Sequence, residues 1–379
     1  MDTVSTGKRS GRNEDIGDRK TRHLEICIDA EHYQVEFGST GFDEMRLIHS
    51  SLPEISEAEI DTSTEFLGAR VRLPLFISSM TGGAEAAYEV NKKLAAAAQQ
   101  AGVPVGMGSI RILFRKPEVL PHFQLKKFAP DVPVVANIGA IQIRDVESAK
   151  IIELLKRLEV QGLAVHLNPA QELFQPEGDR DFRGILDAIT RFCAICPVPV
   201  IVKETGCGVR PDEAGRLLEA GAAYVNIAGS GGTNWIAVEA YRLDTSEEAA
   251  AREFDDWGTP TALILAALGM RNGGRLSGRI LASGGLRSGM DLAKALALGA
   301  SLGGFALPFV RAVSSSGVEG VITLIERYER VLRAAMALTG SRTPAGLRSA
   351  PLLLSPDFST RVRDLQAALS TGGPTGKSP

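Results

Sequence analysis

A polar stretch from His166 to Asp179 contains the residue types that could do chemistry. It reads HLNPAQELFQPEGD, so a histidine, several amides and several carboxylates fall within fourteen residues, directly after an apolar run. Its prolines and glycine argue against a regular helix. Glu172 and Glu177 could hold a hard cation. The side chains that could donate or accept hydrogen bonds beside that cation are His166, Asn168 and Gln171. The alternative is a solvated polar loop, and this stretch alone does not decide between the two.

The composition is that of an ordinary globular protein. Of 379 residues, 44% are hydrophobic and 23% are charged, and the net charge is −3. No basic stripe lies beyond the N-terminal segment, so we expect no nucleic-acid partner. No run of about 18 apolar residues occurs, and the N-terminus lacks the apolar core of a secretory signal. We therefore expect no membrane association and a cytoplasmic location.

The four cysteines are too few for a disulfide framework in so long a chain. Cys193 and Cys196 form a lone CxxC at the end of a helical pattern, whereas a thioredoxin-like motif opens a helix. No second pair completes a zinc site. We interpret these cysteines as structural, together with Cys207.

Eight apolar, β-type runs alternate with amphipathic helical patterns from residue 73 onward. The runs cover residues 75–79, 103–106, 134–138, 163–167, 198–203, 224–228, 279–283 and 303–307, and the helical patterns cover 84–101, 146–159, 182–195, 211–220 and 289–298. Apolar strands that alternate with helices indicate a parallel sheet buried on both faces. Eight such units predict a TIM (β/α)8 barrel. An open doubly wound sheet is the alternative, but no Gly-x-Gly-x-x-Gly opens the first helix.

The expected domain organisation has three parts. These are a flexible N-terminal arm (residues 1–18), a single barrel domain (19–345) and a C-terminal tail (346–379). In the barrel domain, residues 30–70 are expected to form a covering segment, and residues 233–258 a loop inserted after the sixth strand. A last helix is predicted at 318–338, and the tail from Ser355 is predicted to be frayed.

The carboxyl ends of barrel strands face one shared pocket, so the residues at these ends predict the site. Glycines and small residues follow several strands, where backbone N–H groups could approach a flat or anionic ligand closely. The polar side chains at other strand ends include Ser109, Arg111, Asn137 and Lys203. Glycine-rich turns after the seventh strand, with a helix starting near Gly289, match the phosphate site of such barrels. A phosphate site plus a ring-sized pocket suggests FMN.

Together these motifs resemble the type 2 isopentenyl-diphosphate isomerases. The resemblance rests on RKTRH at 19–23, MTGG at 80–83, the polar stretch, KE at 203–204, GGT at 231–233 and SGG at 283–285, and it covers residues from about 19 to about 340. It implies interconversion of isopentenyl and dimethylallyl diphosphate by a 1,3-allylic proton shift, as part of isoprenoid biosynthesis. It also implies reduced FMN as acid and base, Mg²⁺ on the diphosphate and NADPH as reductant. We further expect a homo-oligomer, a tetramer or an octamer.

The resemblance implies roles for the matching residues. The flavin would contact Met80, Thr81, Gly82, Ser109, Asn137, Lys203 and Thr233, and its phosphate would contact Gly285, Leu286, Arg287, Ala306 and Leu307. The substrate would bind Arg19, Lys20, His23, Ser109, Ile110, Arg111, Asn168 and Gln171. Gln171 and His166 would be the catalytic side chains, and Glu172 would hold magnesium. Where this chain has Asn226 and Ala228, the family often has aspartate and serine. The lost hydroxyl would weaken flavin binding by about 1 kcal/mol.

Two other functions remain open at this point. The first is an FMN-dependent hydride-transfer enzyme of the 2-hydroxyacid oxidase or IMP dehydrogenase kind, which would need a histidine base facing the flavin or a nucleophilic cysteine such as Cys207. The second is a non-catalytic flavoprotein, which predicts no turnover and no dependence of ligand binding on magnesium.

Overall fold

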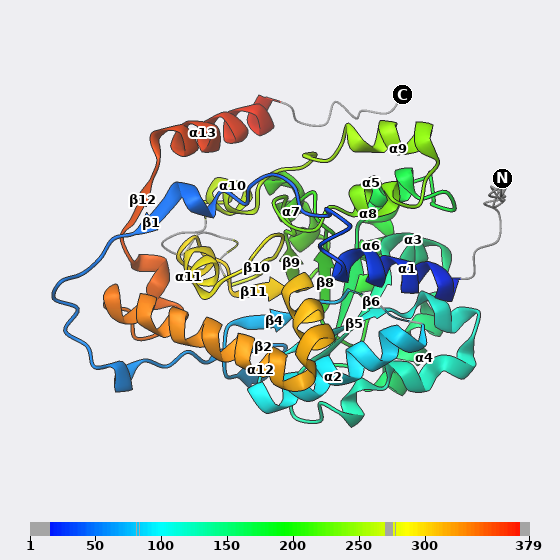
Figure 1. Ribbon diagram of the computed structural model, residues 1–379, viewed down its shortest axis with the longest axis horizontal. Helices are drawn as coiled ribbons and strands as arrows, with labels where there is room; N and C mark the ends of the chain where they lie inside the picture. Colours follow the sequence, from blue (N-terminus) through cyan, green and yellow to red (C-terminus); the bar gives the residue numbers. More distant parts are fainter. Residues whose placement is uncertain (1–15, 81, 83, 270–275, 277, 372–379) are drawn as a thin grey trace, which may run out of the picture.

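Eight parallel strands close into a barrel in the order β10-β11-β4-β5-β6-β7-β8-β9 (Figure 1). The computed structural model describes residues 16–80, 82, 84–269, 276 and 278–371. The barrel strands are β4 (Leu75–Ile77), β5 (Val105–Ser109), β6 (Val134–Gly139), β7 (Gly162–His166), β8 (Val200–Lys203), β9 (Tyr224–Asn226), β10 (Ile280–Ala282) and β11 (Leu302–Phe305). Each overlaps one of the eight predicted runs, which confirms the TIM-barrel prediction.

The strands are predominantly apolar because both of their faces are buried. Val134 and Ala136 of β6 pack outward in the main core, with the surrounding helices. Val135, between them, points inward and packs with Ala164 of β7 and Ile201 of β8. The alternation along each strand therefore separates two hydrophobic layers instead of separating core from solvent.

The predicted helices are present with small shifts of their ends. They are α2 (Glu85–Ala101), α4 (Ser148–Leu158), α6 (Ile185–Cys193), α7 (Pro211–Glu219) and α11 (Gly289–Ala297). Short elements add α3 (Ala140–Asp145), α10 (Thr261–Ala267), η1 (Phe42–Glu44), η2 (Glu57–Glu59), η3 (Ile110–Phe114), η4 (Pro117–Phe123), η5 (Leu125–Lys127) and η6 (Gly346–Ser349). The segment inserted after β9 contains α8 (Trp235–Ala240) and α9 (Thr245–Arg252). This agrees with the predicted insertion.

Two helix predictions need correction. The prolines and glycine of the polar stretch argue against helix, but α5 (Pro169–Phe174) lies within it. Pro169 stands at the start of that helix, where its missing N–H leaves no hydrogen bond unmade. The last helix, α12 (Leu307–Leu338), begins eleven residues before the predicted start at 318. Gly317 has φ 62° and marks a kink, so the sequence pattern reveals only the second half.

A β-hairpin closes the end of the barrel opposite the strand tips. It consists of β2 (Thr64–Phe66) and β3 (Ala69–Val71), which pair antiparallel. Phe66 is fully buried among the inward-facing strand residues, and its ring centroid lies 6.0 Å from that of Phe76 and 5.2 Å from that of Tyr224. The covering segment thus contributes to the inner hydrophobic layer and is more than an external cover.

The prediction of a frayed tail is wrong for residues 356–371, which form helix α13 (Pro356–Thr371). Ahead of it, β12 (Leu352–Leu354) pairs antiparallel with β1 (Met45–Leu47) of the covering segment. Phe358 is completely buried, and the Gln366 amide donates a hydrogen bond to the carbonyl of Ala267 at the end of α10 (2.9 Å). The amphipathic spacing of Phe358, Val362 and Leu365 is the sequence signal for this helix. Residues 372–379 lie outside the described part.

Helix α1 (Ile16–Ile28) lies across the carboxyl ends of the strands, packed against α2, α8 and α12 (Figure 1). Ile26 and Cys27 are buried there with Val238 of α8 and Leu307 of α12. The first fifteen residues of the predicted arm are outside the described residues, and the helix begins at its sixteenth. Among the described helices, none is long and apolar enough to cross a membrane.

We predict that Phe66→Ala lowers the free energy of unfolding by about 3–5 kcal/mol, because it leaves a cavity at the centre of the inner hydrophobic layer. Phe66→Leu, which refills most of the space, should cost clearly less. Chemical denaturation followed by circular dichroism measures both. Equal midpoints for wild type and Phe66→Ala would contradict the role of the hairpin as a barrel plug.

Candidate active site

A polar pocket of about 140 Å³ lies at the strand tips beneath α1. Its lining residues are Arg19, Lys20, His23, Ser79, Met80, Gly82, Ser109, Arg111, Ile112, Asn137, Gln142, His166, Asn168, Gln171, Glu172, Gln175, Lys203, Thr205 and Trp235. Most of the predicted site residues are therefore brought together. The pocket is smaller than the roughly 300–1,000 Å³ of typical ligand sites. Since α1 supplies part of its wall, this helix would have to shift for a flavin ring and a substrate to enter.

His166 ends β7 and faces Asn137 of β6, with 2.6 Å between its Nδ1 and the Asn137 Oδ1. Because that oxygen can only accept, Nδ1 carries the hydrogen and Nε2 is left as an acceptor. Burial lowers the pKa of His166 to about 3, and the positive charges of Lys203, Lys20 and Arg111 act in the same direction. The imidazole is therefore neutral near pH 7 and serves as a fixed hydrogen-bonding group.

The pocket has a strong excess of positive charge. Lys20 Nζ lies 3.4 Å from the Ser109 carbonyl, and burial, together with Arg19 and Arg111, lowers its pKa to about 7. Lys203 donates to the carbonyl of Glu204 (2.8 Å), and burial lowers its pKa to about 8. Crowded, desolvated cations of this kind are stabilised by an anion placed among them. The geometry therefore fits a ligand with several negative charges.

Glu172 is the one carboxylate among the described residues that line this pocket. Its side chain is buried, and its two oxygens accept hydrogen bonds from Asn168 Nδ2 (3.1 Å) and from the backbone N–H of Asp179 (2.8 Å). In the described part of the chain, no group of three or more His, Cys, Asp or Glu side chains could hold a metal. A magnesium ion here would thus rely on Glu172, water and the oxygens of a bound phosphate, which is its usual coordination.

Glu177, the other carboxylate considered as a cation ligand, has a different role. Its Oε1 lies 2.6 Å from Arg19 Nη1 and 3.5 Å from Arg242 Nη2. These ion pairs attach the polar stretch to α1 and to the residues that follow α8. Glu177 therefore neutralises cations instead of adding a second negative charge beside Glu172.

Sequence reasoning missed the buried carboxylate of Glu239 in α8. Its Oε1 lies 3.0 Å from His23 Nε2 and accepts a hydrogen bond from Gln171 Nε2 (2.8 Å), and its Oε2 pairs with Arg242. Burial opposes ionisation, but the hydrogen bonds and charges of these neighbours outweigh it and hold the pKa at about 2. A single glutamate in the apolar helix WIAVEA was the available signal. Glu239 therefore contacts both the predicted catalytic amide of Gln171 and His23 of helix α1.

Gln175 extends this network. With its amide oriented so that both ends are satisfied, its nitrogen donates to Glu239 Oε1 (3.2 Å) and its oxygen accepts from Arg19 Nη1 (3.0 Å). Asn168 Nδ2 donates to Gln171 Oε1 (3.1 Å). Both ends of the Gln171 amide are therefore held, one by Asn168 and the other by Glu239. Its orientation is set before any ligand binds.

Several buried polar atoms at the strand tips fit a bound flavin. The Ser283 hydroxyl donates to Asn226 Oδ1 (2.7 Å), whereas the buried Asn226 Nδ2 and Ser79 Oγ have no hydrogen-bond partner among the described residues. Lys203 adds an ammonium group on the same side of the barrel mouth. Unpaired buried polar groups are costly. The polar edge of a bound flavin ring would provide hydrogen-bond partners for these atoms.

The predicted phosphate site is separate from the polar pocket and lies in the loops after β9, β10 and β11. A Cβ atom at Gly232 would lie 2.3 Å from the backbone nitrogen of Gly285, so these loops approach each other only as bare backbone. The side chains of Leu286 and Leu307 are buried, which leaves only their backbone to meet a phosphate. These features fit a phosphate held by main-chain N–H groups.

The remaining predicted residues that the structure describes do not line the polar pocket. Arg287 pairs with Glu36 and donates to the carbonyl of Leu286 (2.7 Å). Thr233 forms a backbone bridge to Glu36, and Ala306 precedes the start of α12. Ile110 is fully buried, so only its main chain could meet a substrate. Thr81 lies outside the described residues.

The cysteines do not provide a nucleophile. Burial raises the pKa of Cys207 to about 12, with a further contribution from Glu204, so it is a thiol at neutral pH. It lies outside the residues that line the polar pocket. Cys193 and Cys196 are free thiols, and burial raises the pKa of both. This arrangement disfavours a reaction that uses a nucleophilic loop cysteine.

The chain is similar to proteins of known function over most of its length. The model of the FMN-dependent dehydrogenase family matches residues 30–113 and 157–353. The isopentenyl-diphosphate delta-isomerase of Borrelia garinii subsp. bavariensis is 41% identical over 91% of this chain and 95% of that protein. The protein of the same name from Chlorobium limicola is 43% identical over 89% and 96%.

Among solved structures, a mutant flavocytochrome b2 with benzoylformate superposes with a TM-score of 0.63 at 20% identity, covering 88% of this chain and 82% of that one. At this identity the likeness concerns the fold alone. The much closer relatives carry the assignment, and the chain belongs to the family of FMN-dependent, type 2 isopentenyl-diphosphate delta-isomerases.

Proposed function

We propose that the protein interconverts isopentenyl diphosphate and dimethylallyl diphosphate by a 1,3-allylic proton shift, with reduced FMN, Mg²⁺ and NADPH as the source of reduction. The observation that supports this most is the pairing of a crowded cationic pocket with a single fixed carboxylate. Arg19, Lys20 and Arg111 supply charge for a diphosphate, and Glu172 supplies a ligand for a bridging magnesium ion.

The residues of the pocket divide between charge and apolar surface. The hydrocarbon end of the substrate would lie near the side chains of Met80 and Trp235, which line the same pocket. Protonation of an alkene creates positive charge on carbon, which water would trap, so the reacting end must be kept dry. Helix α1 provides this exclusion, because it covers the strand tips while carrying two of the cations for the diphosphate, Arg19 and Lys20.

Reduced FMN, when bound, would supply the acid and base for the proton shift. Lys203, Asn137 and Ser109 would hold its ring, and the glycine loops after β9 and β10 would hold its phosphate. Gln171 cannot exchange protons itself, and its fixed amide would orient the substrate. His166, neutral at pH 7, would accept or donate a hydrogen bond without adding charge. Catalytic roles for Gln171 and His166 are part of this proposal.

The cofactor requirement gives the first test. Purified protein incubated with FMN should retain a yellow flavin after gel filtration and isomerise isopentenyl diphosphate only when that flavin is reduced and Mg²⁺ is present. Bleaching of the flavin by 2-hydroxy acids or IMP under anaerobic conditions would instead support a hydride-transfer enzyme. Protein that takes up no flavin would refute the proposal.

Glu172→Gln should lower kcat/KM by about 100-fold, or about 2.7 kcal/mol, because the amide keeps the size of the side chain but loses the negative charge. Kinetics at increasing Mg²⁺ concentration measure the effect, and the wild-type rate should be approached only at higher Mg²⁺. Glu118→Gln, an exposed substitution in η4, is the matched control and should behave as wild type. A Glu172→Gln enzyme with an unchanged Mg²⁺ dependence would remove the assigned role.

Lys20 should take up a proton when a diphosphate binds above pH 7. With its pKa at about 7, Lys20 is mostly neutral at pH 8 in the free protein, and the anion restores its charge. Calorimetric titration of inorganic diphosphate at pH 8, in buffers of different ionisation enthalpy, measures this uptake. Lys20→Arg, which stays charged, should lose that uptake and bind with a flatter pH dependence. Equal uptake by the two proteins would show that another group titrates.

A further inference from the structure

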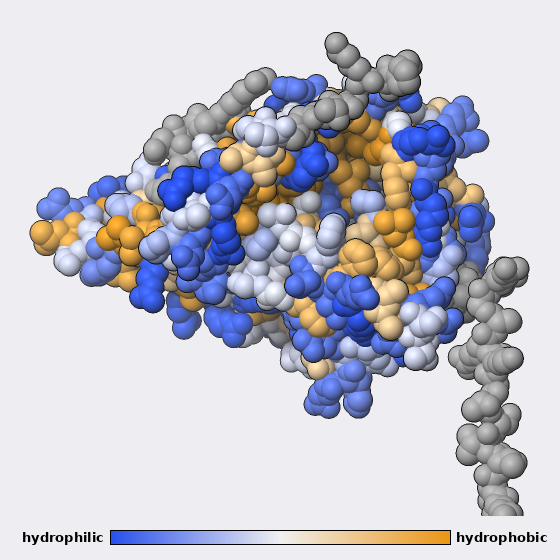
Figure 2. Space-filling view, turned by 90° about the horizontal axis from the view of Figure 1, so that it is seen from above, coloured by the Kyte–Doolittle hydropathy of each residue, from blue (hydrophilic) through white to orange (hydrophobic). Residues whose placement is uncertain are grey.

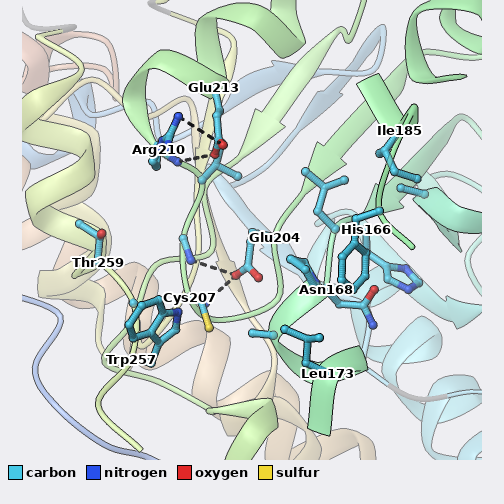
Figure 3. Close-up of a pocket in the computed structure, with 18 of the residues that line it drawn as sticks. His166, Asn168, Leu173, Ile185, Glu204, Cys207, Arg210, Glu213, Trp257 and Thr259 are labelled. Atoms are coloured by element: carbon cyan, nitrogen blue, oxygen red, sulfur yellow. Dashed lines mark hydrogen bonds and ion pairs between the residues drawn. The ribbon is translucent and has the colours of Figure 1, made fainter. Parts of the chain in front are cut away.

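A second, larger cavity of about 840 Å³ lies on the other side of the polar stretch (Figure 3). Its walls come from α5, α6, α7, α8 and the loop that leads to Trp257. The space-filling view shows an apolar hollow bordered by hydrophilic residues on the upper side of the molecule (Figure 2). Its volume falls in the range of small-molecule sites, roughly 300–1,000 Å³. Nothing in the proposed isomerase reaction uses it.

Two of the charged groups in this cavity are already paired. One oxygen of the Glu204 carboxylate accepts hydrogen bonds from the backbone N–H groups of Gly206, Cys207 and Gly208 (2.6, 2.5 and 2.9 Å). Arg210, at the far rim, donates to both carboxylate oxygens of Asp212 (3.1 and 2.8 Å). The remaining wall is mostly apolar, with side chains such as Leu173, Phe174 and Leu186. Recognition along most of the cavity would therefore rest on apolar contact.

Helix α5 separates this cavity from the polar pocket. Gln171 and Glu172 face the polar pocket, whereas Leu173 and Phe174 line the apolar cavity. His166 and Asn168, just ahead of the helix, border both spaces. A molecule that fills the apolar side therefore presses on the same six-residue helix that positions the predicted substrate and magnesium ligands.

The surroundings favour a small molecule over a protein partner. Of the large hydrophobic side chains that are exposed in the described residues, only Leu173 (50% exposed) and Trp257 (58%) line this cavity. The rim otherwise carries charges such as those of Arg210, Glu213 and Arg216. An interface with a second chain needs a wider apolar patch than two side chains. A mostly apolar space of this volume instead fits a hydrocarbon chain.

We propose that this cavity is a binding site for a hydrocarbon chain of isoprenoid or acyl type, which acts on the polar pocket through α5. The site is separate from that of the substrate, and binding there does not depend on the proposed isomerase reaction. Only the expected effect on substrate affinity rests on the proposed function. A chain with a neutral head group is the appropriate probe, because the cations of the polar pocket would attract an anionic one.

Equilibrium dialysis of the full-length protein with FMN, Mg²⁺ and radiolabelled farnesol tests the proposal. We expect saturable binding of one farnesol per chain. Leu186→Trp, which fills the cavity from α6, should weaken binding at least tenfold, and the volume-conserving Leu186→Met should not. Trp257→Gln, at a position that is 58% exposed, should weaken it several-fold. Circular dichroism confirms that each variant is folded.

Competition separates this site from the substrate site. Saturating inorganic diphosphate should leave farnesol bound, and bound farnesol should change the affinity for diphosphate in wild type but not in Leu186→Trp. Displacement of farnesol by diphosphate, binding unchanged in all variants, or absence of binding would each overturn the proposal. Dodecan-1-ol identifies the source: equal competition supports any hydrocarbon chain, and failure to compete supports an isoprenoid.

Discussion

The buried carboxylate of Glu239 is the constraint on which the arrangement of the site depends. A charge buried without partners costs several kcal/mol, so this carboxylate is stable only while His23, Arg242 and the Gln171 amide surround it. Those partners come from α1, from the residues just after α8 and from α5. The cost of leaving Glu239 unpaired thus holds three segments in one arrangement, although they are far apart in sequence. The same carboxylate therefore holds α1 closed over the strand tips and fixes one end of the Gln171 amide.

The cations of the pocket oppose this closure. Helix α1 brings its own Arg19 and Lys20 close to Arg111, and the lowered pKa of Lys20 records the cost of doing so. The negative charges of Glu239, Glu177 and Glu172 compensate for this positive charge only in part. Glu177 pairs with Arg19 at the edge of the pocket, and Glu239 pairs with His23 and Arg242, so neither carboxylate is left for the other cations. A bound anion with several negative charges would neutralise the remaining positive charge. The closed site is therefore poised for the ligand type that the proposed function requires, and an uncharged ligand would gain much less from it.

Much of the fold and of the site could be predicted from sequence, because buried strands and strand tips have local signatures. Runs such as 134–138, in which Asn137 is the one polar residue, are so apolar because both faces of the strand are covered. In a barrel the carboxyl ends of all the strands meet at the common mouth. The two helices that sequence reasoning did not predict, α5 and α13, are short or terminal. Their stability comes from tertiary contacts such as the buried ring of Phe358. Glu239 was missed for a similar reason: its partners lie on other elements, so no local spacing reveals them.

The fold is shared with flavin enzymes that transfer hydride, so the chemistry must be argued from side chains. Hydride abstraction from a hydroxy acid needs a base that can take up a proton, and the pKa of about 3 leaves His166 a poor base in the free protein. An allylic proton shift assisted by a flavin needs no such group, and instead needs charge to bind the diphosphate and apolar surface to keep the reacting carbon dry. The polar pocket supplies both, with its cations and with the side chains of Met80 and Trp235. The short helix α5 lies between this pocket and the apolar cavity, since Gln171 and Glu172 line the first and Leu173 and Phe174 the second. So short a helix has little stability of its own, and its position is set by the contacts on each face. A ligand in the apolar cavity would therefore change the position of Gln171 and Glu172 in the polar pocket.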